Sequence, residues 1–154
     1  MAFYSFDTSA FLNGRRDLLP PEIFKTVWRN IEEAIAEGKV RAVEVVRDEL
    51  NRRDDGVSKW ASKQPNLYLP LGPEVQHATR DVLAEHPRLM GRGGGRNAAD
   101  PFVIGLARVR VGVVVTEESL SGNLAKPRIP DVCQALQGPC VNLIGFIQRQ
   151  GWSY

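Results

Sequence analysis

Short strand-like segments alternate with amphipathic helical segments along this chain, and that alternation constrains its fold more than any other feature. Strands are predicted at 2–6, 40–43, 111–116 and 140–142, with a further extended stretch at 65–70. Helices are predicted at 22–37, 44–53, 73–85, 101–110, 129–136 and 143–150, with a weaker one at 57–63. Strands that alternate with helices are typical of a parallel sheet covered on both faces. The sequence therefore predicts a three-layer α/β/α fold with a mostly parallel central sheet.

The chain has the size of one domain, because 154 residues suit a single hydrophobic core. We expect residues 1–154 to form that domain, with no linker and no internal repeat. The apolar runs are far shorter than the ~20 residues of a membrane-spanning helix, and the first residues lack the pattern of a signal peptide. Cys133 and Cys140 have no pattern of a zinc site, so we expect two buried thiols and a cytoplasmic location.

Four acidic residues lie at positions where a parallel sheet gathers its functional groups. Asp7 ends the first strand, and Glu118 follows the strand at 111–116. Asp100 precedes Pro101 as the expected N-cap of a helix, and Glu49 lies one turn into another. Sites in such folds form outside the carboxyl ends of the strands, so we expect these carboxylates to converge.

The motifs around these acids resemble those of the PIN domain family. They follow one another in the order Phe6-Asp-Thr-Ser9, Val46-Arg-Asp-Glu-Leu50, Asp100-Pro-Phe-Val-Ile-Gly-Leu-Ala107 and Val115-Thr-Glu-Glu118. The Gly38-Lys-Val step and Ile129-Pro-Asp-Val-Cys133 are similar to a branch related to VapC-type toxins. The resemblance covers nearly the whole chain and implies a metal-dependent endoribonuclease, the toxin of a toxin–antitoxin pair. It also implies an antitoxin protein as partner and a homodimer.

The resemblance assigns a role to each acid of the cluster. Asp7, Asp100 and Glu118 would hold Mg²⁺ or Mn²⁺, which are hard ions that prefer oxygen ligands. Glu49 would bind the metal or orient the attacking water. Catalytic residues are thus expected at all four positions. Thr8 or Thr116 would add a hydrogen bond that orients a ligand.

The fourth acid departs from the PIN pattern. Most PIN domains carry Thr-x-Asp after this strand, whereas this chain has Thr116-Glu-Glu118 with a longer side chain. Glu117 is therefore an alternative to Glu118. Asp131 is a further acid expected either near the site or as the N-cap of a short helix, and the sequence leaves both open.

The charge balance suits a polyanionic substrate once the four acids of the expected site are left out of the count. With four acids of the 18 placed in the site, 14 remain against 20 basic residues. Four arginines near the expected site are candidate contacts for RNA phosphates, with an ordinary solvated role as the alternative: Arg15, Arg16, Arg92 and Arg96.

Replacing Arg92 and Arg96 together by Ala is expected to weaken RNA binding and to flatten its dependence on salt. Both arginines lie in a glycine-rich stretch shortly before Asp100, and each phosphate contact adds to the salt slope. Affinities measured at several salt concentrations test this. A slope equal to that of the unaltered protein would rule the contact out.

Two other functions are compatible with the sequence. A PIN-like protein that binds RNA or another protein but cleaves little is kept open by the departure at Glu118. A flavodoxin-like regulatory domain would need an acidic pair at the first strand, where only Asp7 stands. The glycine-rich stretch lacks the Gly-Lys-Ser/Thr ending of a P-loop, and His77 and His86 have no nucleophile motif beside them.

Overall fold

The fold centres on a five-stranded sheet whose strands are all parallel. The computed structural model describes residues 2–90 and 98–154. Its strands are β1 (Tyr4–Phe6), β2 (Val40–Val43), β3 (Tyr68–Leu69), β4 (Val113–Val115) and β5 (Cys140–Val141). Their order across the sheet is β3-β2-β1-β4-β5. The predicted three-layer α/β fold is confirmed, and the sheet is fully parallel where a mostly parallel one was expected.

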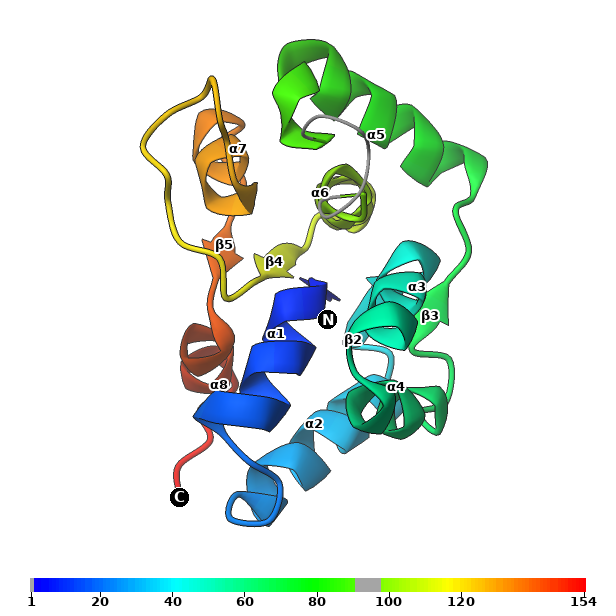
Figure 1. Cartoon of the computed structure of the whole chain (residues 1–154), viewed down its shortest axis with the longest axis vertical. Coiled ribbons are helices and arrows are strands. Elements are labelled where there is room, and N and C mark those ends of the chain that lie inside the picture. Colours follow the sequence, from blue (N-terminus) through cyan, green and yellow to red (C-terminus); the bar gives the residue numbers. More distant parts are fainter. Residues whose placement is uncertain (1, 91–97) are drawn as a thin grey trace.

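Helices cover both faces of this sheet (Figure 1). One face carries α2 (Lys25–Ala36), α4 (Asp55–Ser62) and α8 (Leu143–Gln150), and the other carries α5 (Pro73–Glu85), α6 (Asp100–Arg110) and α7 (Ile129–Ala135). The remaining α-helices, α1 (Thr8–Asn13) and α3 (Glu44–Arg53), follow β1 and β2 directly, and a 3-10 turn covers Pro87–Met90. The central strand is β1, and β4 is its neighbour, so residues just after these two strands lie near the middle of one sheet edge.

Aromatic side chains on the α8 side of β1 make a tightly packed part of the core. The ring of Phe146 lies edge-on to Tyr4 at 4.8 Å and to Phe6 at 5.1 Å between centroids. Phe6 also packs on Phe11 from α1, and all three phenylalanines are fully buried. Such pairs add about 0.5–1.5 kcal/mol each beyond the area they bury. This packing fixes the end of β1, from which Asp7 projects.

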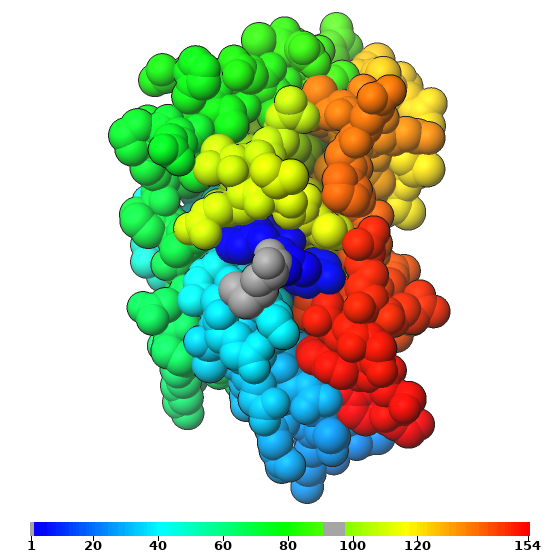
Figure 2. Space-filling model, turned by 180° about the vertical axis from the view of Figure 1, so that it is seen from behind, coloured from blue at the N-terminus to red at the C-terminus, as the bar shows by residue number. Residues whose placement is uncertain are grey.

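Figure 2 shows the molecule from behind, at the edge of the sheet where β1 begins. The first residues of the chain, in blue, are enclosed between the yellow-green end of α6 and the cyan segment before β2. In the described ranges 2–90 and 98–154, no helix is both long and apolar enough to cross a membrane.

The segment after Asp7 is helical, although the first helix was predicted only at 22–37. Helix α1 begins at Thr8 and continues through a π-helical turn at Gly14–Leu18. The helix is too short for a visible period of 3.6 residues, which is why its pattern escaped prediction. Its buried face, with Phe11 and Leu12, packs into the core.

The strand predicted at 111–116 is shorter because Val111 ends α6 instead. Val111 is 92% exposed and has a left-handed backbone with φ of 51°, the conformation that usually falls to glycine at a helix end. Gly112 is required one residue later, because a Cβ there would lie 2.5 Å from the carbonyl oxygen of Phe3. The apolar run thus spans a helix cap and a strand.

Two smaller predictions also need correction. Helix α2 begins at Lys25, three residues later than predicted at 22–37. Of the two thiols expected to be buried, Cys133 is buried and Cys140 is partly exposed, and both are free.

Candidate metal centre

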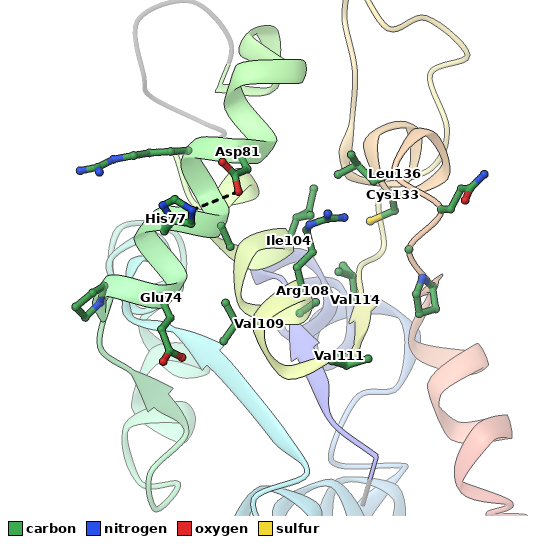
Figure 3. A pocket seen from close by; sticks show the side chains of 18 residues that line it. Glu74, His77, Asp81, Ile104, Arg108, Val109, Val111, Val114, Cys133 and Leu136 are labelled. Carbon is green, nitrogen blue, oxygen red and sulfur yellow. Dashed lines mark ion pairs between the residues drawn. The ribbon is translucent and has the colours of Figure 1, made fainter.

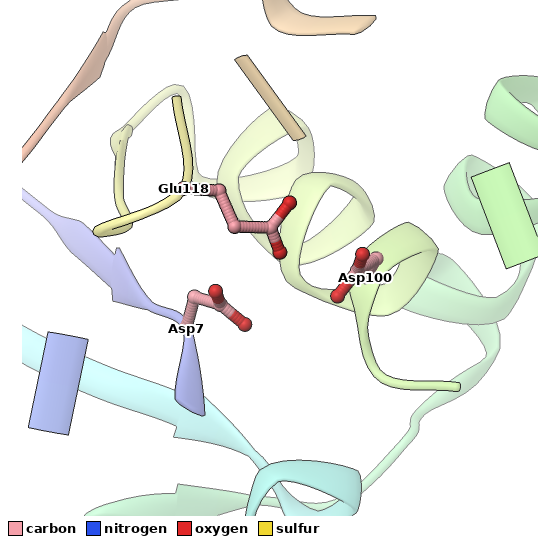
Figure 4. Close-up of side chains that lie close together, drawn as sticks. All are labelled: Asp7, Asp100 and Glu118. Atoms are coloured by element: carbon pink, nitrogen blue, oxygen red, sulfur yellow. The ribbon is translucent and has the colours of Figure 1, made fainter. Parts of the chain in front are cut away.

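Three carboxylates from distant parts of the chain meet at the carboxyl edge of the central strands. Asp7 follows β1, Asp100 begins α6, and Glu118 lies in the loop after β4. One oxygen of each lies within 4.8 Å of the others, and Figure 4 shows the three side chains pointing toward a common space. Asp7 and Asp100 are only 2% and 4% exposed, so this is a buried cluster and not an acidic surface patch.

Hydroxyl groups hold the carboxylate of Asp7 in one orientation. Ser9 Oγ and Thr116 Oγ1 both donate to Oδ2 of Asp7, at 2.7 and 2.9 Å. The two hydroxyls also lie 3.1 Å apart, and the backbone N–H of Glu117 donates to Ser9 Oγ. One carboxylate oxygen of Asp7 is thereby fixed by the protein. Thr116 thus contacts the carboxylate of Asp7, and its role in orienting a metal ligand stays a prediction.

The two consecutive glutamates after Thr116 have different partners. The carboxylate of Glu118 joins the cluster and accepts a hydrogen bond from the N–H of Ile129, at 3.1 Å. Glu117 accepts instead from the N–H of Leu143, at 2.7 Å, at the start of α8. The geometry thus separates the two alternatives that the sequence left open: Glu118 lies in the acidic cluster, and Glu117 tethers a helix.

Asp100 occupies the first turn of α6 and not the N-cap position predicted for it. The N-cap is Ala99, and Pro101 fits the first helical turn as expected. The carboxylate of Asp100 is therefore not used to cap its own helix. It faces the cluster.

Glu49 lies beside the cluster but uses both carboxylate oxygens for hydrogen bonds to the protein. Oε2 accepts from the hydroxyl of Thr8 at 2.7 Å, and Oε1 accepts from the N–H of Ala99 at 3.0 Å. Glu49 is 4% exposed and comes from α3, so it ties the start of α1 to the residue before Asp100. These contacts suit a residue that positions Asp7 and Asp100 better than they suit a metal ligand.

Burial and mutual repulsion make the ionised cluster unfavourable by itself. Burial, and after it the charges of Asp7 and Glu118, raises the pKa of Asp100 far above its usual value. Burial, with the charge of Asp7 next in size, raises the pKa of Glu118 to about 7. Burial also raises the pKa of Asp7 and of Glu49, against the hydrogen bonds that they accept.

No basic side chain offsets this charge by direct contact in the described part of the chain. The ion pairs found among residues 2–90 and 98–154 all lie elsewhere, as with Arg16 and Asp54 or Lys39 and Glu37. Buried carboxylates without a paired base either bind protons or need a cation.

The donor set and its spacing fit a hard divalent cation. All donors are carboxylate oxygens, which Mg²⁺ and Mn²⁺ prefer. Opposite ligands of an octahedral Mg²⁺ lie about 4.2 Å apart, given about 2.1 Å for each bond. Oxygens that lie within 4.8 Å of one another therefore reach one ion through small side-chain rotations. The residues that would hold it are Asp7, Asp100 and Glu118.

Asp131 has a structural role away from this centre. Its carboxylate accepts from the backbone N–H groups of Ser121, Gly122 and Arg128. It occupies the third position of α7, so the predicted N-cap role is wrong; Arg128 is the N-cap. Although burial acts to raise the pKa of Asp131, these donors outweigh it and lower the pKa to about 2.

Replacing Asp131 by Ala is expected to lower the free energy of unfolding by about 1–3 kcal/mol, because three backbone donors lose their acceptor. Its depressed pKa means that this contribution is present above about pH 4 and is lost as the pH falls toward 2. Urea unfolding at pH 7 measures the change. The exposed Asp48→Ala is the control, and equal effects of the two substitutions would contradict the assignment.

The arginines expected to contact RNA have these surroundings. The guanidinium of Arg15 stacks over the rings of Trp28 and Trp60, at 4.8 and 4.1 Å from their centroids. Arg16 pairs with Asp54 at 3.5 Å. The other two, at 92 and 96, lie outside the described residues. Arg15 therefore has a packing role of its own, and RNA contact by all four stays a prediction.

A hollow lies between α5, α6 and the turn after α7, outside the acidic cluster (Figure 3). Its volume is about 820 Å³. Ile104, Val109 and Leu136 line its walls, while His77 and Asp81 of α5 lie 3.8 Å apart at one side. None of the three clustered acids lines this hollow, so it is separate from the candidate metal centre.

Ser9 is a member of the site that sequence reasoning did not single out. Its hydroxyl contacts both Asp7 and Thr116, and so joins the first strand end to the segment after β4. A signal for it was available, because a serine two residues after the strand-end acid is part of the motif Phe6-Asp-Thr-Ser9.

Comparison with known proteins gives a family without a known activity. A family model described as "Domain of unknown function (DUF4411)" matches residues 4–154. That match covers all the elements of the sheet and all the acids of the cluster. No curated protein matches the chain.

Proposed function

We propose that this chain, which belongs to the DUF4411 family, is an endoribonuclease that depends on Mg²⁺ or Mn²⁺. The observation that carries the proposal is the convergence of Asp7, Asp100 and Glu118 within 4.8 Å, with Asp7 and Asp100 buried and Glu118 partly buried. Such an arrangement is costly without a cation and is well suited to hold one. The resemblance of the surrounding motifs to PIN domains supports a nuclease over other uses of the metal.

Some side chains of the site would hold the cation, and others would orient those ligands. Asp7, Asp100 and Glu118 would hold the cation, which supplies Lewis-acid stabilisation of the charge that develops on the phosphate. Ser9 and Thr116 keep Asp7 from rotating away. Preorganised ligands of this kind save reorganisation during the reaction.

Glu49 would act through its neighbours. It holds Thr8, the first residue of α1, and Ala99, the residue before Asp100. The two acids that flank these residues are thereby kept at a fixed separation. This role differs from the metal ligand or water-orienting base that the resemblance implies for Glu49.

The side chain of Glu118, the fourth acid, is longer than the aspartate of most PIN domains and has a backbone hydrogen bond that holds it. A glutamate reaches farther than the aspartate of most PIN domains, and Oε1 of Glu118 is held by the N–H of Ile129 at the start of α7. That contact fixes the added length of the side chain. The Thr-Glu-Glu sequence is therefore compatible with a working site.

RNA as the substrate and a partner antitoxin belong to the same proposal. The surplus of basic residues outside the cluster suits a polyanion. By its resemblance to VapC-type toxins, the protein would act as a homodimer and be inhibited by an antitoxin that covers the acidic cluster. The proposal includes action in the cytoplasm, since its two thiols are free.

Cleavage of a pool of structured RNAs by the purified protein tests the proposal. We expect products with Mg²⁺ or Mn²⁺ and none with EDTA, because the three carboxylates alone cannot stabilise a phosphate anion. Metal-independent cleavage would contradict it. Binding of RNA and metal without cleavage would favour the alternative, a PIN-like protein that binds RNA but does not cut it.

A further inference from the structure

A side pocket of about 500 Å³ opens directly beside the acidic cluster. Thr116 and Glu118 form the wall that it shares with the cluster. The opposite walls come from α7, through Gln134, and from the segment where β5 leads into α8, through Asn142. A group bound in this pocket would lie next to whatever the three carboxylates hold.

The lining of the side pocket is rich in hydrogen-bonding amides. Gln134 and Asn142 are exposed, and each carries a side-chain carboxamide. The oxygen of Asn142 accepts from the N–H of Gly145, so its amide nitrogen is left to donate, while Gln134 offers both a donor and an acceptor. Among the lining residues that the structure describes, Glu118 is the one carboxylate, and none is a Lys or Arg.

Apolar surface completes the pocket. Leu120 is 55% exposed and lines it together with Pro130. The exposed leucine can pack against the face of a flat heterocycle, while the neighbouring amides can form hydrogen bonds with its edge. A phosphate would find no cation there, because the described lining contains no basic side chain.

We propose that the side pocket binds one base of single-stranded RNA next to the scissile phosphate. The size is within the range of small-ligand sites, and carboxamides match the donors and acceptors on a base edge. This assignment rests on the proposed function for its choice of RNA. It adds that Gln134 determines which base is accepted, and that the base must leave the helical stack to enter.

Titration with the four nucleoside 5′-monophosphates in the presence of Mg²⁺, followed by amide NMR, tests the proposal without requiring cleavage. The side-chain amide of Gln134 should shift most with the preferred nucleotide. Gln134→Ala should weaken that nucleotide about tenfold, the worth of one base hydrogen bond, and leave the others less affected. Gln148→Ala, which removes an exposed amide of α8 outside the pocket, should change nothing.

A second variant separates recognition from packing. Gln134→Glu keeps the shape of the side chain but removes its donor, so the ranking of the four nucleotides should change in favour of bases that donate. Unchanged ranking and affinity in both Gln134 variants would overturn the assignment. If the wild type cleaves RNA while these nucleotides cause no shifts at the pocket, the pocket fails and the nuclease stands. Shifts at Gln134 without cleavage of any RNA would retain the pocket and reject the nuclease.

Discussion

Asp100→Asn is expected to lower RNA cleavage by about 100- to 1,000-fold, or below detection, while the fold is preserved. The substitution removes one of three carboxylates that would share the cation, but it keeps the size of a buried side chain in the first turn of α6. Losing one preorganised electrostatic group commonly has an effect of that size. Asp7→Asn should behave alike, because the amide oxygen still accepts from Ser9 and Thr116.

The control for these variants is Asp48→Asn on α3. Asp48 is next to Glu49 in sequence, but its side chain is 56% exposed and pairs with Arg47 at 3.7 Å. The substitution Asp48→Asn also removes one carboxylate charge, but at a position outside the acidic cluster. Cleavage rates of the three variants on one RNA, with circular dichroism to verify the fold, make the comparison. Full activity of both cluster variants would reject the catalytic assignment.

Without metal, Asp100→Asn is expected to stabilise the protein, by about 2 kcal/mol at pH 8. Burial and repulsion by Asp7 and Glu118 raise the pKa of Asp100 to about 10, so folding at pH 8 requires this carboxyl to take up a proton, and Asn removes that cost. A variant that loses function and gains stability is unusual for a residue whose purpose is packing. It is the expected behaviour of a ligand whose cation has been removed.

The pH dependence of stability has a defined sign. The pKa of Glu118 is raised to about 7 by burial, with the charge of Asp7 next in size, against an ordinary value of 4.5. Between these values the folded protein holds a proton that the unfolded chain has released. That contribution is complete below about pH 4.5 and is lost as the pH rises through 7, so the metal-free protein should be more stable at pH 5 than at pH 8.

Urea unfolding in EDTA at pH 5 and pH 8 measures both effects. Addition of Mn²⁺ at 100 times its dissociation constant should raise the stability of the wild type by about 2.7 kcal/mol and that of Asp100→Asn far less. Asp48→Asn should follow the wild type in all conditions. If Asp100→Asn destabilised the metal-free protein at pH 8, the assignment of Asp100 as a buried carboxyl group without a paired base would be wrong.

The sequence was sufficient to predict the layers of the fold and the carboxylates that meet. Runs such as Val113–Val115 are strongly apolar, helices such as α2 have clear periodicity, and an acid directly after a buried strand seldom serves packing. Asp7, Asp100 and Glu118 were predicted together and are found together. Convergence of residues more than a hundred positions apart follows from the parallel topology.

The periodicity of apolar residues does not predict short helices or the partners of individual side chains. Helix α1 has only six residues, and the choice between Glu117 and Glu118 depends on which backbone N–H each side chain meets. Neither kind of contact leaves a pattern in sequence. The hydrogen bonds of Glu49 to Thr8 and Ala99 likewise depend on where two backbone segments pass, and its expected catalytic role stays a prediction.

The measurement that tests the central claim most directly is the titration of metal-free protein with Mn²⁺, followed by electron paramagnetic resonance of the free ion. We expect saturable binding that Mg²⁺ displaces, that Asp100→Asn abolishes and that Asp48→Asn retains. Equal binding by the wild type and Asp100→Asn, or no binding by either, would contradict the assignment of Asp7, Asp100 and Glu118 as a divalent-cation site.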